Sequence, residues 1–293
     1  MKIYKKTIAP YTLWAFVFII ISLAMVFYFA LTDATGAVTF ANFTRIASWR
    51  TMGTLLRSFK IALFTTLLCF LIGYPFAYFV TGLKLRFQTT ALLLVIIPMW
   101  MNFLLRTYAW VTILSKHGLL NSFLARFGVG PLDLLYTEGA VILGMVYNFL
   151  PFMILPIYTA LEKMDNSLIE AAQDLGCNKF QAFIRVIFPL SLPGVASGIA
   201  MVFIPAISTF EITALLGGNK TNLIGNVIEQ QFSVTGDWNY GSALSVILMI
   251  FLVGSLLFNK GEAGGRKKSG GSLSNPLVTP EAGANLAKEV RHV

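Results

Sequence analysis

The chain has 293 residues, of which 56% are apolar and only 12% are charged, against about 25% charged residues in an ordinary soluble domain. It contains 25 phenylalanines and has a mean hydropathy of +0.74, which is more apolar surface than a soluble domain of this size could bury. These values exclude a soluble enzyme, a disordered chain and a fibrous protein, and they predict a membrane protein with several spans. The two cysteines exclude a disulfide framework and a cysteine-based zinc site, and we expect no metal site.

Six segments are long and apolar enough to cross a bilayer, since a spanning helix needs about 20 mostly apolar residues. They are Tyr11–Leu31, Lys60–Leu83, Thr89–Ser115, Gly139–Leu161, Ser191–Leu216 and Tyr240–Phe258. We therefore predict an all-α membrane protein with six transmembrane helices, because the alternating polarity of a β-barrel is absent. The first segment follows three lysines, as a signal peptide would. Its apolar run is too long for a signal peptide and no small-residue cleavage site follows it, so we expect an uncleaved anchor.

The distribution of basic residues predicts the orientation of the chain. With six spans, the N-terminus, the second and fourth loops and the tail share one side, and this side holds most of the lysines and arginines. Both termini are therefore predicted to be cytoplasmic. We interpret the net charge of +9 as an orientation signal in contact with membrane lipid, and we expect no nucleic-acid partner, because no basic domain with exposed aromatic residues exists.

The predicted cytoplasmic loop 162–190 is expected to fold, because Leu168, Ile169, Ala172 and Leu175 recur at helical spacing. Ser167 to Glu170 has the form of a capping box, and Gly176 suits the left-handed residue that ends a helix. A second short helix follows, which Pro189 would stop or kink. Composition alone does not decide whether this hairpin lies on the membrane or docks into a soluble partner.

The same loop resembles the EAA motif of ABC importer permeases, in which EAA, three residues, Gly and nine residues precede I-x-L-P. Here Glu170-Ala171-Ala172 is followed by Gly176 and by Val186-Ile187-Phe188-Pro189, with Val and Phe in place of Ile and Leu. The resemblance implies that the first helix of the loop inserts into a cleft of an ATPase subunit. The residues implied in this coupling are Glu170, Ala171, Ala172, Gly176 and Pro189.

Three further segments resemble permeases of spermidine/putrescine importers, and most of all the first of their two permease subunits. They are Ile97–Trp110, Met145–Asp165 and Phe203–Gly218, and the resemblance covers roughly Phe59–Phe258. It implies a type I ABC importer permease-like fold in a bacterial-type plasma (inner) membrane and the import of polyamines. Because relatives that carry other small solutes share much of this scaffold, another small solute stays an alternative.

The resemblance also implies partners. They are a dimer of ATP-binding ABC subunits, a second homologous permease and an extracytoplasmic substrate-binding protein. The chain has no Walker A loop, so we expect ATP hydrolysis in a separate subunit, no catalytic residue here and no cofactor in this chain. Six spans cannot form a two-fold pore alone, so a partner permease is required; whether the pore is a heterodimer or a homodimer stays open.

These inferences divide the chain into four parts. Residues 1–10 form a cytoplasmic N-terminus, and residues 11–58 form the first transmembrane helix and an outer loop. Residues 59–258 form the permease core, including the coupling loop 162–190. Residues 259–293 change abruptly to Gly, Ser and Lys, which predicts a disordered cytoplasmic tail.

Polar and aromatic residues at membrane depth are candidates for the substrate path, since carboxylates and aromatic faces bind a flexible polycation. The candidates are Trp100, Tyr108, Trp110, Tyr147, Asn148, Thr209 and Glu211. For Glu211 two interpretations stay open: it meets an amine or closes an outer gate, or it pairs with Arg106 or caps a helix break. The aromatic candidates could equally lie at the membrane interface, and Tyr147 and Asn148 could equally pack in the core.

Two other classes of protein fit the sequence less well. A secondary transporter or channel needs no ATPase, but the folded inner loop has no purpose in such a protein and no internal repeat is evident. An intramembrane enzyme would need a motif such as HExxH or GxSxG, or paired acids within one span, and none is present. One structural motif is clear: Gly194 and Gly198 form a small-residue face that we expect to seat the fifth span against a neighbour.

Overall fold

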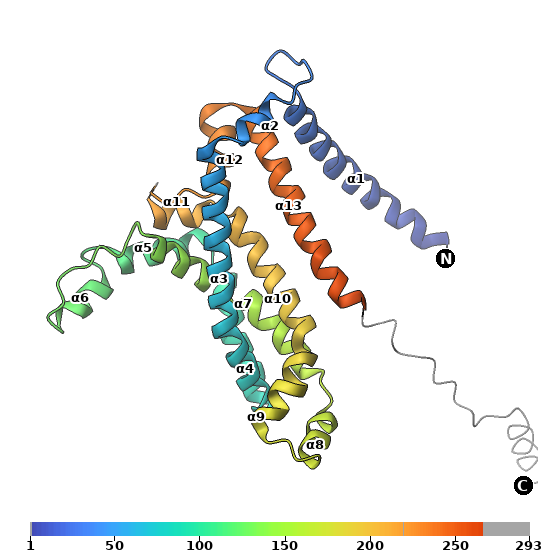
Figure 1. Ribbon diagram of the computed structural model, residues 1–293, viewed down its shortest axis with the longest axis vertical. Coiled ribbons are helices and arrows are strands. Elements are labelled where there is room, and N and C mark those ends of the chain that lie inside the picture. The colour runs from blue at the N-terminus through green and yellow to red at the C-terminus, as the bar shows by residue number, and fades with distance from the viewer. Residues whose placement is uncertain (1, 219, 266–293) are drawn as a thin grey trace, which may run out of the picture. The chain divides into compact units, whose positions relative to one another are not determined.

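The computed structural model describes residues 2–218 and 220–265, and this part of the chain is almost entirely helical (Figure 1). Its α-helices are α1 (Lys2–Leu31), α2 (Ala41–Ile46), α3 (Trp49–Thr81), α4 (Leu85–Ile96), α5 (Phe103–Leu114), α6 (Leu119–Ala125), α7 (Glu138–Glu162), α8 (Asn166–Asp174), α9 (Lys179–Ala182), α10 (Phe188–Ser208), α11 (Glu211–Gly217), α12 (Ile224–Gln230) and α13 (Trp238–Gly265). A 3-10 turn, η1 (Ile97–Trp100), and two π turns, η2 (Phe183–Ile187) and η3 (Gln231–Thr235), complete the elements.

Five stretches of helix are long and apolar enough to cross a membrane. They are Pro10–Ala30, Trp49–Thr81, Glu138–Glu162, Lys179–Ser208 and Trp238–Ser255. A sixth crossing exists if Leu85–Trp100 and Phe103–Ala125, which are bent by 93° at the break between them, are counted as one broken span. The all-α fold with up to six spans is therefore confirmed for the described residues.

The third predicted span, Thr89–Ser115, differs from the single helix that we expected. Pro98 lies in the 3-10 turn η1, and the chain then becomes extended at Met101. Asn102 starts a new helix, because its Oδ1 accepts the backbone N–H groups of Leu104 and Leu105 at 2.9 and 3.4 Å. A proline followed by an N-cap residue thus breaks the span into two helices.

The fifth predicted span, Ser191–Leu216, is also broken. Helix α10 ends at Ser208, Thr209 is extended, and α11 begins at Glu211. The boundaries of other spans move outward: α1 begins at Lys2, within the predicted N-terminus, and α3 begins at Trp49, before Lys60. Helix α13 runs to Gly265, beyond Phe258, and residues 266–293 of the predicted tail lie outside the described residues.

The core of the bundle is formed by α3, α7 and α10, which pack closely because glycines let their backbones approach. A Cβ at Gly194 would lie 2.5 Å from Ala160 Cβ and 2.7 Å from the Pro156 carbonyl oxygen on α7. At Gly198 it would lie 2.8 Å from Met153 Sδ. The expected seating of this face against a neighbour is confirmed, and the neighbour is α7.

Ion pairs and hydrogen bonds fix the end of the bundle at which α7 begins. Arg57 Nη2 on α3 lies 2.7 Å from Glu138 Oε1, the first residue of α7. Arg57 Nη1 also donates to the Lys220 carbonyl at 3.2 Å, so one side chain joins α3, α7 and the segment after α11. Helix α11 itself packs against α7 at Gly144, where a Cβ would overlap Leu216.

Candidate coupling loop and transport path

The loop between α7 and α10 folds into two short helices, as expected, but the capping residue differs from the prediction. Asp165 caps α8, and its Oδ1 accepts the Ser167 N–H at 2.9 Å. The predicted capping box from Ser167 to Glu170 is therefore wrong, because the helix begins one residue before Ser167. Hydrogen bonds from the Ser167 backbone and side chain lower the pKa of the Asp165 carboxyl group.

A capping box does form at the second helix, where sequence reasoning did not place one. Asn178 Oδ1 accepts the Gln181 N–H at 2.8 Å, and Gln181 Oε1 accepts the Asn178 N–H at 3.0 Å. The signal was present in the sequence as an Asn followed three residues later by a Gln.

Gly176 makes the turn between the two helices. Its φ is +88°, the left-handed conformation that was expected. The Cys177 N–H donates to the Ala172 carbonyl and the Gly176 N–H to the Gln173 carbonyl, at 3.0 and 2.9 Å. This pair of hydrogen bonds is a Schellman motif, which ends α8 sharply and fixes the direction of the next helix.

Helix α8 has no buried residue, although one of its faces is apolar. Glu170, Ala171 and Gly176 are exposed and Ala172 is half-buried, so the EAA segment lies on the surface of the chain. Two large apolar side chains stand beside it: Leu175 is 87% exposed and Phe180 is 70% exposed. An apolar surface of this kind is typical of an interaction site.

Pro189 does not stop the second short helix, which was one of the two predicted alternatives. Helix α9 passes through the π turn η2 directly into α10, and the stretch Lys179–Ser208 is continuous. In the π turn, the Phe188 N–H donates to the Phe183 carbonyl five residues earlier. The wider turn accommodates a proline, which has no N–H to donate, at the start of α10. Pro189 itself is half-buried there.

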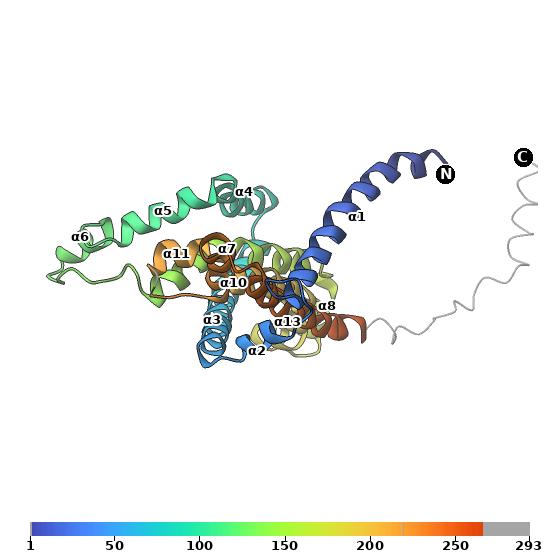
Figure 2. The ribbon, with the colours of Figure 1, turned by 90° about the horizontal axis from the view of Figure 1, so that it is seen from above.

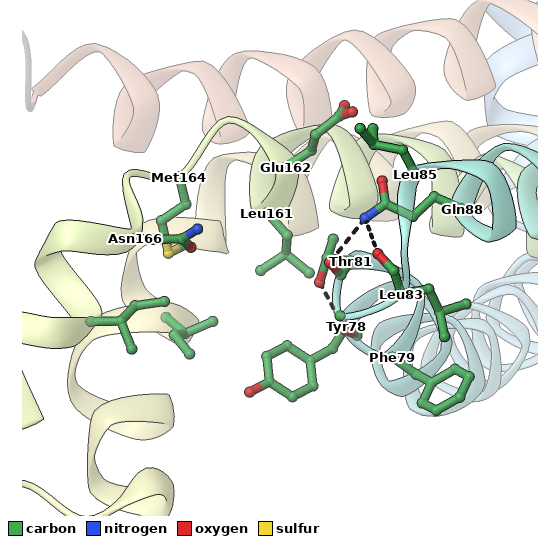
Figure 3. A pocket seen from close by; sticks show the side chains of 13 residues that line it. Tyr78, Phe79, Thr81, Leu83, Leu85, Gln88, Leu161, Glu162, Met164 and Asn166 are labelled. Carbon is green, nitrogen blue, oxygen red and sulfur yellow. Dashed lines mark hydrogen bonds between the residues drawn. The ribbon is translucent and has the colours of Figure 1, made fainter.

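A cavity of about 700 Å³ lies beside the coupling loop, between the turn from α3 to α4 and the start of α8 (Figure 3). Gln88 closes one wall: its Nε2 donates to the carbonyls of Thr81 and Leu83 at 3.1 and 2.8 Å. The Tyr158 hydroxyl donates to Gln88 Oε1 at 3.0 Å and so ties α4 to α7. No sequence motif pointed to this contact, because it joins residues that are far apart in the chain.

The candidate path residues on η1, α5 and α7 do not form a single cluster. Trp110 packs edge to face on Tyr147, with ring centroids 5.4 Å apart and planes at 71°. Asn148 is buried beside Tyr147, and its Nδ2 donates to the Gly144 carbonyl while its Oδ1 has no partner. Trp100 stands apart from these residues, on η1 at the break, and is 80% exposed. Tyr108 is also exposed.

Thr209 and Glu211 lie at the break between α10 and α11. Thr209 is buried, and its hydroxyl donates to Glu211 Oε2 over a long 3.4 Å. Glu211 is the half-buried first residue of α11, whose N-cap position is Phe210 without a side-chain hydrogen bond, so Glu211 lies at a helix break but does not cap it. The expected pair between Glu211 and Arg106 is not formed in the structure.

Comparisons with known proteins agree with this architecture. Residues 70–259 match the family described as "Binding-protein-dependent transport system inner membrane component". The chain is similar to the spermidine/putrescine transport system permease protein PotB of Haemophilus influenzae, with 39% identity over 86% of this chain and 91% of the relative. It is 44% identical to PotB of Escherichia coli over 73% of this chain and 78% of the relative.

Solved structures share the fold at lower identity. A chain of a bacterial ABC transporter involved in the import of the acidic polysaccharide alginate superposes with a TM-score of 0.77 at 16% identity, covering 89% of this chain and 94% of the other. A chain of the MetNI methionine ABC transporter gives a TM-score of 0.54 at 18% identity, over 73% and 96%. The expected type I ABC importer permease fold is confirmed. The chain belongs to the family of inner membrane components of binding-protein-dependent transport systems, as a multi-pass permease subunit.

Proposed function

We propose that this chain is a permease subunit of an ATP-driven importer for polyamines such as spermidine and putrescine. The names of the relatives at 39% and 44% identity support this substrate class. We further propose that both termini and α8 face the cytoplasm, in agreement with the basic residues on that side. The alternative of an ATP-independent secondary transporter has no support among these relatives.

The observation that carries the coupling role is that α8 has no buried residue, although both of its ends are fixed by hydrogen bonds. Asp165 at one end and the Schellman turn at Gly176 at the other fix both ends of the helix, while only Ile169 and Ala172 of α8 are partly buried. A rigid helix with an unused apolar and small-residue surface can enter a cleft of another protein at little cost in conformational entropy. We propose that Glu170, Ala171, Ala172 and Gly176 contact the ATPase subunit, with Pro189 holding the joint to α10.

The remaining partners follow from the same assignment. A second homologous permease would complete the pore, and a substrate-binding protein would deliver the polyamine on the outer side. A related alginate transporter has been solved in complex with a periplasmic protein that holds an alginate pentasaccharide, which supports a partner of this kind. The substrate path is proposed to include Trp100, Tyr108, Trp110, Tyr147, Asn148, Thr209 and Glu211.

The coupling role is tested with a matched pair of glycine variants. Gly176 and Gly128 both have a left-handed φ, +88° and +76°, and neither has an atom within 4 Å of the position of a Cβ. Gly176→Trp should leave the chain inserted in the membrane but abolish co-purification of the ATPase from mild detergent. Gly128→Trp carries the same backbone strain on the predicted outer side and should retain the ATPase.

Uptake of radiolabelled spermidine by the complete complex in proteoliposomes tests the substrate. Saturable, ATP-dependent uptake supports the proposal, and competition by putrescine but not by alginate oligosaccharides or methionine defines the class. Full ATPase recovery and full transport with Gly176→Trp would count against the coupling role. Recovery of the wild-type chain without any ATPase would count against the importer itself.

A further inference from the structure

The break between α10 and α11 has no side-chain cap of its own. Helix α10 ends at Ser208, and Phe210, the N-cap residue of α11, makes no side-chain hydrogen bond to the helix that follows. The break contains Thr209 and immediately precedes Glu211, which are two of the candidate path residues. The contacts that hold this break therefore decide where both of these side chains stand.

Asn226 on α12 holds the break from outside the two helices. Its Nδ2 donates to the Phe210 carbonyl at 3.0 Å. Its Oδ1 accepts the Leu223 N–H at 3.1 Å and lies within hydrogen-bond distance of the Thr213 hydroxyl on α11. These partners also fix the orientation of the amide, because a backbone N–H can only donate and a carbonyl can only accept. One amide group thus joins the first turn of α12 to the first turn of α11.

Gly225 brings the backbone of α12 directly against the same break. A Cβ at this position would overlap the Ser208 carbonyl oxygen and lie 3.0 Å from the Thr209 carbonyl oxygen. Both neighbours are backbone atoms, which cannot rotate aside as the end of a side chain can, so the approach requires glycine. Two adjacent residues of α12 therefore hold the break, one through backbone contact and Asn226 through hydrogen bonds.

The start of α12 is itself anchored on α3, next to which it lies in Figure 1. The Ile224 N–H donates to Ser58 Oγ at 2.8 Å, and the buried Ser58 hydroxyl donates to the Thr54 carbonyl at 2.8 Å. Arg57, on the same helix, donates to the Lys220 carbonyl at 3.2 Å. Helix α11 packs on α7, beside which Figure 2 shows it. Through α12, the break is thus tied to α3, which belongs to the core of the bundle.

We propose that Asn226 is a positioning residue for transport, which holds the break between α10 and α11 so that Thr209 and Glu211 stand at a fixed place in the substrate path. In this role Asn226 acts through the start of α11 and does not itself contact substrate. The inference rests on the proposed polyamine transport. Loss of the hold weakens apparent affinity, because an incoming substrate must then order the break as it binds.

The first test is Asn226→Leu, which keeps a side chain of similar size and removes all of its hydrogen bonds. The readouts are KM and maximal rate of radiolabelled spermidine uptake by the complete complex in proteoliposomes. KM should rise about fivefold or more, as expected from the loss of one or two hydrogen bonds. Asn222→Leu, which changes an exposed asparagine of the same segment, is the control and should leave KM within about twofold of wild type.

A milder pair of variants separates positioning from folding. Thr213→Val keeps the shape of the side chain and removes the hydroxyl that meets Asn226 Oδ1, so KM should rise. Thr213→Ser restores the hydroxyl and should return KM to within about twofold of wild type. In the Asn226→Leu background, Thr213→Val should have little further effect on KM, because the two side chains belong to one hydrogen-bond network.

Hydrogen exchange of the detergent-solubilised complex gives a readout that needs no substrate. Exchange at the first turn of α11 should rise in Asn226→Leu and in Gly225→Ala, whose methyl group would push α12 away from the Ser208 carbonyl. Exchange at α8 should stay as in the wild type. Gly53→Ala on α3, where no atom lies within 4 Å of the Cβ position, is the matched glycine control.

Two results would overturn the proposal. One is a smaller yield of assembled complex whose KM is that of the wild type, which would make Asn226 merely structural. The other is unchanged exchange at the start of α11 in both α12 variants.

Failure of this inference is distinguishable from failure of the proposed function. If the wild-type complex takes up spermidine and Glu211→Gln raises KM, whereas Asn226→Leu does not, only the positioning role is lost. If the wild-type complex takes up no polyamine, the proposed function is overturned together with the role of Asn226 in transport, and hydrogen exchange still decides whether Asn226 holds the break.

Discussion

Helices α7 and α1 are both apolar enough to span a membrane, yet 61% of the most apolar window of α7 is buried within the chain, against 6% for α1. The difference lies in small residues. Helix α7 offers Gly144 to α11 and meets the glycines of α10, whereas α1 has no glycine and carries bulky side chains such as Trp14 and Phe18 outward. Hydropathy therefore identifies the helices that enter the membrane, and small residues identify those that pack together.

The largest effect is expected from a variant that disrupts the packing of α10 against α7. Gly194→Leu forces a side chain into Ala160 and the Pro156 carbonyl, and backbone cannot move aside as a flexible side chain could. We expect a loss of about 1–3 kcal/mol in stability, visible as a large drop in folded protein recovered from detergent and in Tm. Gly254→Leu on α13, where no atom lies within 4 Å of the Cβ position, is the control and should be neutral. Equal losses in both variants would refute the packing argument.

A smaller effect is expected at the one end of α1 that is fixed by hydrogen bonds. Asn239 Nδ2 donates to the carbonyls of Phe29 and Thr32 at 3.1 and 2.8 Å, and Asn42 Nδ2 donates to those of Ala30 and Thr32 at 3.2 and 2.9 Å. Asn239→Ala should cost about 1 kcal/mol and increase hydrogen exchange at the end of α1. Asn222→Ala, which changes an exposed asparagine, should leave exchange there unchanged.

A still smaller effect is expected along the rest of α1. Phe16 and Phe18 are 62% and 58% exposed. Replacing both with alanine should change the stability of the isolated chain by less than about 0.5 kcal/mol, because exposed positions contribute little. Thermal unfolding of the isolated chain measures this, and the same variant in the full complex measures what partners add. A loss as large as that of Gly194→Leu in the isolated chain would show that α1 packs within its own subunit.

The smallest effect concerns α8, a short helix without a buried residue that is neither a membrane span nor part of the core. The lowered pKa of Asp165 means that its cap on α8 is present above the ordinary aspartate range of about 4 and is lost as pH falls through the lowered value. Hydrogen exchange at the start of α8 should therefore rise in acid. Asp165→Asn, which can still cap, should remove that pH dependence, and its persistence in this variant would assign the effect to another group.

Local features of this fold could be predicted from the sequence, whereas features set by tertiary packing could not. The role of Gly176 could be predicted because a left-handed φ favours glycine, and those of Gly194 and Gly198 because a side chain there would overlap α7. The break at Asn102 was missed because a long apolar run hides an N-cap residue. The contact between Gln88 and Tyr158 has no local signal at all. Among the path candidates, the sequence indicated residue types, while the pairing of Trp110 with Tyr147 and the isolation of Trp100 depend on how α5 crosses α7.

The continuous stretch from Lys179 to Ser208 has a mechanical consequence. Its 30 residues join the loop that contains α8 to the break at Thr209, a helical length of about 45 Å. A tilt of about 5° imposed at the loop, with the stretch turning as one body, displaces the far end by about 4 Å, which is comparable to one helical turn. The π turn sets the orientation of α9 around the axis of α10. Removal of one residue from Phe183–Ile187 would rotate α9 about that axis by about 100°. Under the proposed coupling role, a movement of α8 would be transmitted along this stretch to the break at Thr209.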